Sequence, residues 1–162
     1  MYKGFYEQIK KALGVFFDEF EIRTIGFGGF ERLPTDAGRL SQDLNILLVR
    51  PVMIEEDFFD AQRTQRRNTT LWRIYYIRRW DGNFDAFDVM LEHAERMLEV
   101  LNKVRFEAFR LEKKEFVFEV VPIAQQVRRI NTESDAELWF LQNPEINLQC
   151  IVLEMEITSL IK

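Results

Sequence analysis

One run of oxygen-bearing side chains has the spacing of a calcium-binding loop. Asp81, Asn83, Asp85 and Glu92 occupy the first, third, fifth and twelfth positions of that pattern, a spacing that lets carboxylates converge on one hard cation. The sixth position is Ala86, although the tight turn of such a loop needs glycine there. The helical periodicity also begins before Glu92, so the sequence favours a turn and a helix cap and predicts no metal site.

Other side chains that carry out catalysis in proteins lack suitable partners here. His93 is the only histidine and Cys150 the only cysteine, which is a poor basis for a transition-metal site and excludes an intrachain disulfide. The glycines of residues 26–29 do not have the spacing of a dinucleotide or phosphate loop and favour a bulge or turn. We therefore expect no catalytic residue, no cofactor, no bound metal and no enzyme activity.

The densest local feature is a basic and aromatic stretch in the middle of the chain. Arginines beside aromatic rings are typical of protein interfaces. They are also typical of single-stranded nucleic-acid sites, where bases stack on the rings and arginines contact phosphates. A third interpretation is a solvated face without a role. The stretch contains Arg63, Arg66, Arg67, Arg73, Arg78 and Arg79, interleaved with Trp72, Tyr75 and Tyr76.

We favour the protein interface, because an all-arginine set suits fixed bidentate contacts with carboxylates and the rest of the chain is acidic. Acidic residues, including Glu55, Glu56, Glu154 and Glu156, are expected to offer complementary charge on a neighbouring copy. The alternative is a nucleic-acid-binding module that uses residues 63–79. The candidate interface residues are Arg63, Arg66, Arg67, Arg73, Tyr75, Arg79, Phe58, Phe59, Glu154 and Glu156.

Apolar periodicity predicts the elements that position these side chains. Spacings of three and four residues predict amphipathic helices over residues 2–20 and 85–102, with Asn83 or Asp85 as the cap of the second helix. A capping box over residues 134–137 opens a short helix that continues through residue 141. Alternation and short apolar runs predict strands over residues 21–30, 43–54, 69–80, 115–124 and 148–161.

Alternation also predicts which side chains of two strands face the core. The strand over residues 69–80 is expected to bury one face and to expose a basic, aromatic outer face, and to form a hairpin with the preceding strand through a long tip, residues 55–68. The inward set is Trp72, Ile74 and Tyr76, with Trp80 as a further candidate, and the outward set is Arg73, Tyr75, Ile77 and Arg79. In the last strand Ile151, Leu153, Met155 and Ile157 face inward, and Glu154 and Glu156 face outward.

Length and composition are those of one globular domain. The chain has 162 residues, of which 47% are hydrophobic and 30% charged, and its formal net charge is −5. This charge is wrong for a nucleic-acid polycation, and no apolar run is long enough to span a membrane. We expect a soluble α+β domain over residues 1–162. Its predicted sheet is mixed and mainly antiparallel, with the order α-β-β-β-α-β-β and the helices on one face.

The order of elements resembles that of the tail terminator, or tail completion, proteins of long-tailed bacteriophages. The likeness rests on the N-terminal helix of residues 2–20, the long hairpin that enters the helix DAFDVMLEHAERMLEVL, and the closing strands EFVFEVVPI and QCIVLEMEITSLI. It implies a structural protein of the virion neck, assembled in the bacterial host cytoplasm. Such a protein forms a homo-oligomeric ring, usually a hexamer, that caps the tail tube protein and joins it to the head–tail connector protein. DNA would be only a passing cargo.

Overall fold

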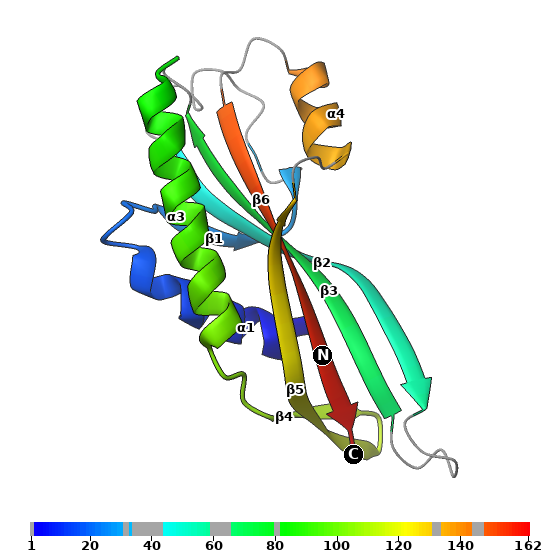
Figure 1. Ribbon diagram of the computed structural model, residues 1–162. Helices are drawn as coiled ribbons and strands as arrows, with labels where there is room; N and C mark the ends of the chain where they lie inside the picture. Colours follow the sequence, from blue (N-terminus) through cyan, green and yellow to red (C-terminus); the bar gives the residue numbers. More distant parts are fainter. Residues whose placement is uncertain are drawn as a thin grey trace.

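The computed structural model describes residues 2–30, 33, 44–58, 66–79, 82–130, 134–143 and 148–162. In this part of the chain, three α-helices accompany one six-stranded mixed sheet (Figure 1). The predicted α+β class and the mainly antiparallel sheet are therefore confirmed. None of the helices in the described ranges is long and apolar enough to cross a membrane.

The strand order of the sheet is β1-β2-β3-β6-β5-β4. Only β1 and β2 pair in parallel, and every other neighbouring pair is antiparallel. The central strands β2, β3, β5 and β6 are long, which gives the sheet its extended, twisted shape. The strands are β1 (Thr24–Phe27), β2 (Asn45–Phe58), β3 (Arg66–Arg79), β4 (Phe109–Lys113), β5 (Phe116–Ile130) and β6 (Leu148–Ile161).

Two of the three helices begin and end close to the predicted limits, and the N-terminal helix is shorter than predicted. Helix α3 (Phe84–Lys103) starts after Asn83, whose side chain accepts a hydrogen bond of 2.9 Å from the backbone N–H of Asp85, so Asn83 is the predicted cap. Helix α4 (Ser134–Gln142) matches the short helix. Helix α1 (Tyr2–Leu13) is shorter than residues 2–20, because the chain tightens into a 3-10 turn, η1 (Gly14–Phe16), where glycine is a poor helix former.

The larger hydrophobic core lies between one sheet face and the helices α1 and α3. Side chains of α1 and α3 pack there on inward residues of β2, β3, β5 and β6. Trp80 lies outside the described residues. The other inward residues predicted for β3 and β6 are all in this core and buried, so the alternation of both strands is confirmed on this face. They are Trp72, Ile74, Tyr76, Ile151, Leu153, Met155 and Ile157.

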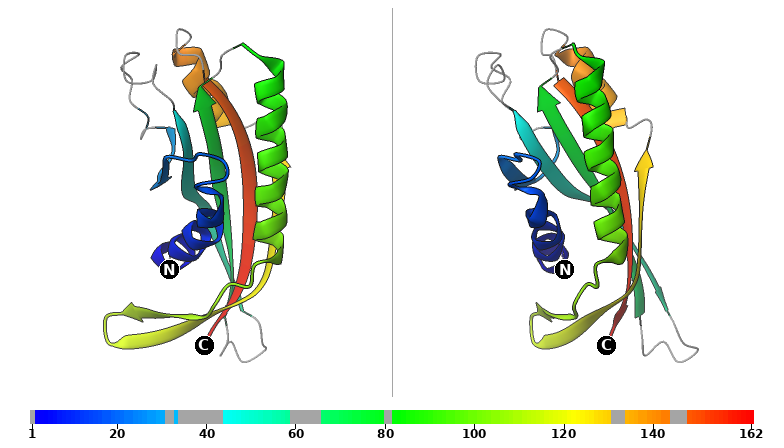
Figure 2. Two further views of the ribbon diagram at one scale, coloured as in Figure 1. Left: turned by 90° about the vertical axis from the view of Figure 1, so that its left-hand side faces the viewer. Right: turned by 60° about the vertical axis from the view of Figure 1, so that its left-hand side comes forward.

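A second, smaller core covers one end of the opposite sheet face. Ala136 and Trp139 of α4 pack there with Phe30, and Tyr75 and Ile77 of β3 lie beneath them. Figure 2 shows α1 and α3 on one side of the sheet and α4 on the other. The prediction that all helices lie on one face is therefore wrong for α4, and Tyr75 and Ile77 are buried where the sequence predicts an exposed face.

Strand β4 is missing from the predicted order, and β5 continues to Ile130 rather than residue 124. The antiparallel β4–β5 pair turns at Lys114, whose φ of 55° lies in the left-handed region. The register of β5 on β6 shifts between Pro122 and Ala124, and proline favours such a bulge because it cannot donate to the ladder. The bulge therefore interrupts the alternation of side chains near Pro122, but β5 continues beyond it to Ile130.

Candidate subunit interface

The predicted interface residues do not form one exposed surface. Arg63 and Phe59 lie outside the described residues. Phe58 is the last residue of β2, and the structure describes its backbone but not its side chain. Arg67, Arg79 and Glu156 are exposed. Arg66 is half-buried, with its guanidinium carbon 5.4 Å from the centre of the Phe118 ring.

Glu154 is buried between two arginines of its own chain. The Arg73 Nε donates to Glu154 Oε2 at 3.4 Å, and the Arg128 Nε donates to Oε1 at 3.0 Å. The three residues face one another across β3, β6 and β5, because Arg73 pairs with Glu154 and Glu154 with Arg128. The carboxylate raises the pKa of the Arg128 guanidinium. The sequence predicts an acceptor on a neighbouring copy, but this carboxylate already has its basic partners within the chain.

Tyr75 is buried, although the sequence predicts it on an exposed face. Its ring packs at 5.0 Å from that of Phe30, and its hydroxyl accepts a 3.1 Å hydrogen bond from Arg50 Nε. Trp72 and Tyr76 are buried on the other face. Base stacking needs exposed ring faces, so none of these three buried rings offers a face on which a base can stack.

The arginine-bearing strand is also not part of a free two-stranded arm. β3 pairs with β2 on one side and with β6 on the other, and the β6 pairing runs from Arg79 and Leu148 to Arg66 and Ile161. The predicted tip of residues 55–68 is shorter in the structure, because residues 55–58 and 66–68 continue the ladder. Residues 66–79 of the basic stretch thus form a central strand of the sheet.

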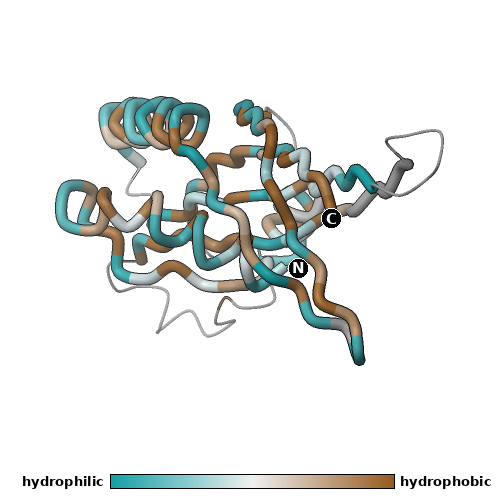
Figure 3. Tube along the Cα trace, turned by 90° about the horizontal axis from the view of Figure 1, so that it is seen from below, coloured by the Kyte–Doolittle hydropathy of each residue, from teal (hydrophilic) through white to brown (hydrophobic). Residues whose placement is uncertain are grey.

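The projecting arm of this molecule is instead the β4–β5 hairpin. Figure 3 shows the hairpin extending from the body, and Figure 2 shows the same arm at the end of the sheet away from α4. At its tip Phe116 and Val117 are 65% and 61% exposed. Burial increases along the strand away from the tip, since Phe118 is half-buried and Val120 is buried. The charged turn at residues 113–115 was the available signal for this hairpin.

The opposite end of the molecule contains an open pocket of about 400 Å³. It lies where β5 ends, since Ile130 pairs with Val152 and, in the described ranges, β6 residues 148–151 pair with β3 alone. Four elements line it, and most lining side chains are apolar. They are Phe87 and Leu91 of α3, Arg129 and Ile130 of β5, Ala136, Glu137 and Phe140 of α4, and Cys150, Ile151 and Val152 of β6.

His93 is half-buried and packs against residues of the larger core. Its ring stacks on Phe20 with 3.8 Å between centroids, and its Nδ1 lies 2.9 Å from the Tyr76 hydroxyl. Burial lowers the pKa of His93, and the charges of Arg78 and Arg96 lower it further. Within the described part of the chain, no group of three His, Cys, Asp or Glu side chains lies close enough to hold a metal ion.

Sequence comparison names no family for this arrangement. A scan against protein-family models finds no match to the chain, and a search of curated proteins finds no significant relative.

Proposed function

We propose that this protein is a structural component of a phage neck, a ring-forming tail terminator that caps the tail tube and joins it to the head connector. The observation that carries the proposal is the presence of different apolar surfaces at opposite ends of one domain. One is the hairpin tip with Phe116 and Val117, and the other is the α3–α4 end with its pocket and the exposed Phe84 and Leu141.

Two different surfaces on one chain are what a head-to-tail assembly requires. A ring with more than two subunits is built from heterologous contacts, in which one patch of each copy meets a second patch of the next. Large exposed apolar side chains that gather in a patch mark contact sites on otherwise polar surfaces. The α+β architecture and the element order from which the resemblance starts also support the proposal.

Light scattering and electron microscopy test this function directly. We expect the purified protein, alone or on tail tubes of the same phage, to form particles of about six times the 19.5 kDa chain mass. Added to growing tubes, it should stop elongation at one end and leave a ring-shaped cap visible there. A chain that remains monomeric in both settings, while tubes grow at their normal rate, would remove the proposal.

A further inference from the structure

A long part of strand β5 has a strand beside it on one side only. β5 pairs with β6 from Val120 to Ile130, whereas β4 pairs only with residues 116–120 of β5. In the described part of the chain, no strand lies along the other edge of residues 121–130. Such an edge presents backbone N–H and C=O groups to strands of other molecules, and an edge that stays open leads to pairing between copies.

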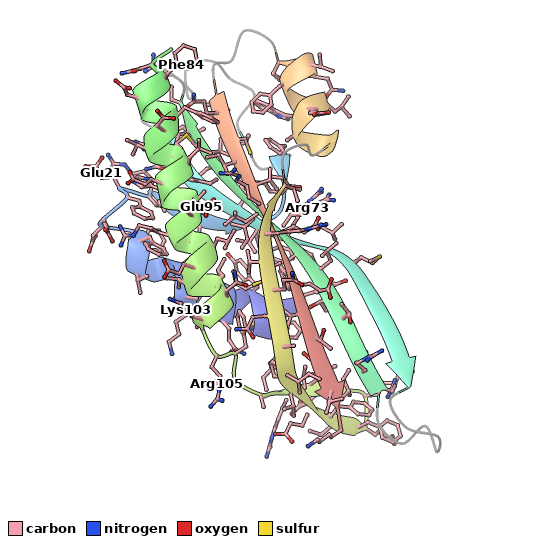
Figure 4. All side chains as sticks on the ribbon, in the orientation of Figure 1. Glu21, Arg73, Phe84, Glu95, Lys103 and Arg105 are labelled. Atoms are coloured by element: carbon pink, nitrogen blue, oxygen red, sulfur yellow. The ribbon has the colours of Figure 1, made fainter. Side chains whose placement is uncertain are left out.

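Helix α3 lies along this edge. Figure 4 shows α3 running beside β5, with Glu95 near the middle of the helix and Lys103 at its end. Arg129 Nη1 of β5 lies 3.4 Å from Glu95 Oε1. Four residues earlier in β5, the Gln125 Nε2 donates a hydrogen bond to the carbonyl oxygen of Val104, the first residue after α3. Both contacts therefore start from residues that point to the same side of the strand.

Asn102 of α3 makes the contact between these two, and it binds the backbone of β5. Its Oδ1 accepts a hydrogen bond of 2.9 Å from the N–H of Val127, and its Nδ2 donates to the Val127 carbonyl oxygen at 3.5 Å. A carboxamide carries the same donor and acceptor as a peptide unit. The two bonds therefore reproduce the exchange of N–H and C=O that joins directly opposite residues of an antiparallel ladder.

The strand itself is regular where Asn102 covers it. Nearer to β4, Pro122 lacks an N–H and a bulge follows it, and both features discourage a further strand. Residues 124–130 contain no proline, and their register on β6 is continuous. This segment therefore has the geometry of a strand that could accept a neighbour.

The sequence of the segment also permits pairing between two copies. In an antiparallel pair centred on Val127, Gln126 lies opposite Arg128 of the second copy, and Gln125 lies opposite Arg129. Like charges placed directly opposite each other would oppose such a pair, and this register contains none. Protection of the edge must therefore come from the residues that cover it.

We propose that Asn102 closes the outer edge of β5 in the manner of a single strand residue, and that it thereby prevents antiparallel pairing of β5 with β5 of a second copy. The inference is independent of the proposed ring, because the contact lies within one chain.

Hydrogen exchange of the Val127 amide tests the contact itself. Asn102→Ala removes the carboxamide, and alanine is the better helix former, so the circular dichroism spectrum of the wild type should be retained. We expect the Val127 amide to exchange about tenfold faster, as the loss of one hydrogen bond implies. Lys103→Ala is the matched control, because Lys103 is the next residue of the helix and pairs with Glu99. It should leave this exchange rate unchanged.

Disulfide cross-linking tests whether the edge is closed to a second copy. Gln126 and Arg128 are exposed, and in the pair centred on Val127 they face each other at a position without ladder hydrogen bonds. Their Cα atoms would lie about 4.5 Å apart there, a separation that a disulfide spans. One protein carries Gln126→Cys and a second carries Arg128→Cys, both with Cys150→Ala to remove the native thiol.

The two single-cysteine proteins are mixed, oxidised mildly and separated on a non-reducing gel. A heterodimer should form when both also carry Asn102→Ala, and it should be absent at the same concentration when Asn102 is kept. Faster Val127 exchange together with this heterodimer supports the inference. Unchanged exchange in Asn102→Ala, no heterodimer, or an equal yield with Asn102 present would each overturn it and leave the proposed ring unaffected.

Discussion

Glu154 is the only charged side chain that is buried in the described part of the chain. A buried carboxylate needs both hydrogen bonds and counter-charge, because its transfer from water costs several kcal/mol. Arg73 and Arg128 supply both across neighbouring strands. The row that they form with Glu154 therefore holds β3, β6 and β5 in one register, and its role is structural.

Removal of the Glu154 charge should destabilise the fold. Glu154→Gln keeps the shape but leaves the half-buried Arg73 without its counter-charge. We expect a loss of about 2 kcal/mol in the free energy of unfolding. The loss is limited because the Arg128 side chain is 68% exposed, so solvent screens its interaction with Glu154. Urea unfolding measures the loss. Glu156→Gln, at an exposed position, should change stability by no more than about 0.5 kcal/mol.

His93 should make stability depend on pH near neutrality. Its pKa in the folded protein is lowered from 6.5 by burial, so the unfolded chain binds the proton first as the pH falls. Stability is then full above pH 6.5 and decreases as the pH falls from there toward the lower folded-state pKa.

Urea unfolding at a series of values between about pH 8 and pH 5.5 measures this dependence. His93 is the only histidine, so His93→Asn should be less stable at the upper end, where it loses the stack on Phe20, but should show a flatter profile. A variant whose stability falls as steeply as that of the wild type would assign the effect to other groups.

At the scale of elements, α4 converts part of an open sheet face into a second core. Phe30 is the central ring of this core, at 5.0 Å from Tyr75, 5.7 Å from Trp139 and 6.1 Å from Phe140. It reaches the sheet from the segment after β1, whereas Trp139 and Phe140 come from α4. The two segments are more than a hundred residues apart in the chain and meet over residues of β2, β3 and β6.

Phe30→Ala should therefore release α4 while the larger core stays folded. We expect a loss of about 3 kcal/mol, the cost of a buried ring and its cavity. Amide hydrogens of residues 134–142 should exchange faster than those of α3. Phe27→Ala is the control, because Phe27 is 40% exposed and should cost roughly 1 kcal/mol. Unchanged exchange in α4 would show that another contact holds the helix.

At the scale of the whole molecule, five strongly exposed apolar side chains lie at the two ends of the domain, whereas others, such as Val15 and Ile123, lie elsewhere on its surface. Phe84, Leu138 and Leu141 lie at the α3–α4 end, and Phe116 and Val117 lie at the hairpin tip. The aromatic rings of the basic stretch are in the interior between them. This distribution favours association with proteins at the ends over stacking of bases along the sheet.

We expect single-stranded DNA to leave the fluorescence of buried tryptophans unchanged. Trp72 is fully buried and its Nε1 donates to Thr70 Oγ1 at 3.2 Å, so a base cannot reach its ring. Titration with oligothymidylate in a Trp80→Phe background measures the response, since Trp80 lies outside the described residues. Strong quenching that decreases with added salt would favour the nucleic-acid-binding module over the proposed ring.

Local sequence patterns were sufficient to predict the elements that are long enough to show several turns of helical spacing or several alternations of a strand. The apolar stripe and Asn83 define α3, and the alternation of β6 places its inward residues correctly. Strand β4 was not predictable in the same way, because FRLEK spans five residues and too few alternations to distinguish a strand from a loop. It becomes a strand by pairing with β5.

What the sequence by itself determined is the α+β class, the long helix α3 and the inward face of the central strands, because each follows from the spacing of neighbouring residues. Only the tertiary structure decided what happens on the opposite face. Tyr75 is buried because α4 and Phe30 cover it, and Glu154 is paired because two other strands bring arginines beside it. Burial and charge pairing of this kind depend on segments far apart in the chain, which no local period records.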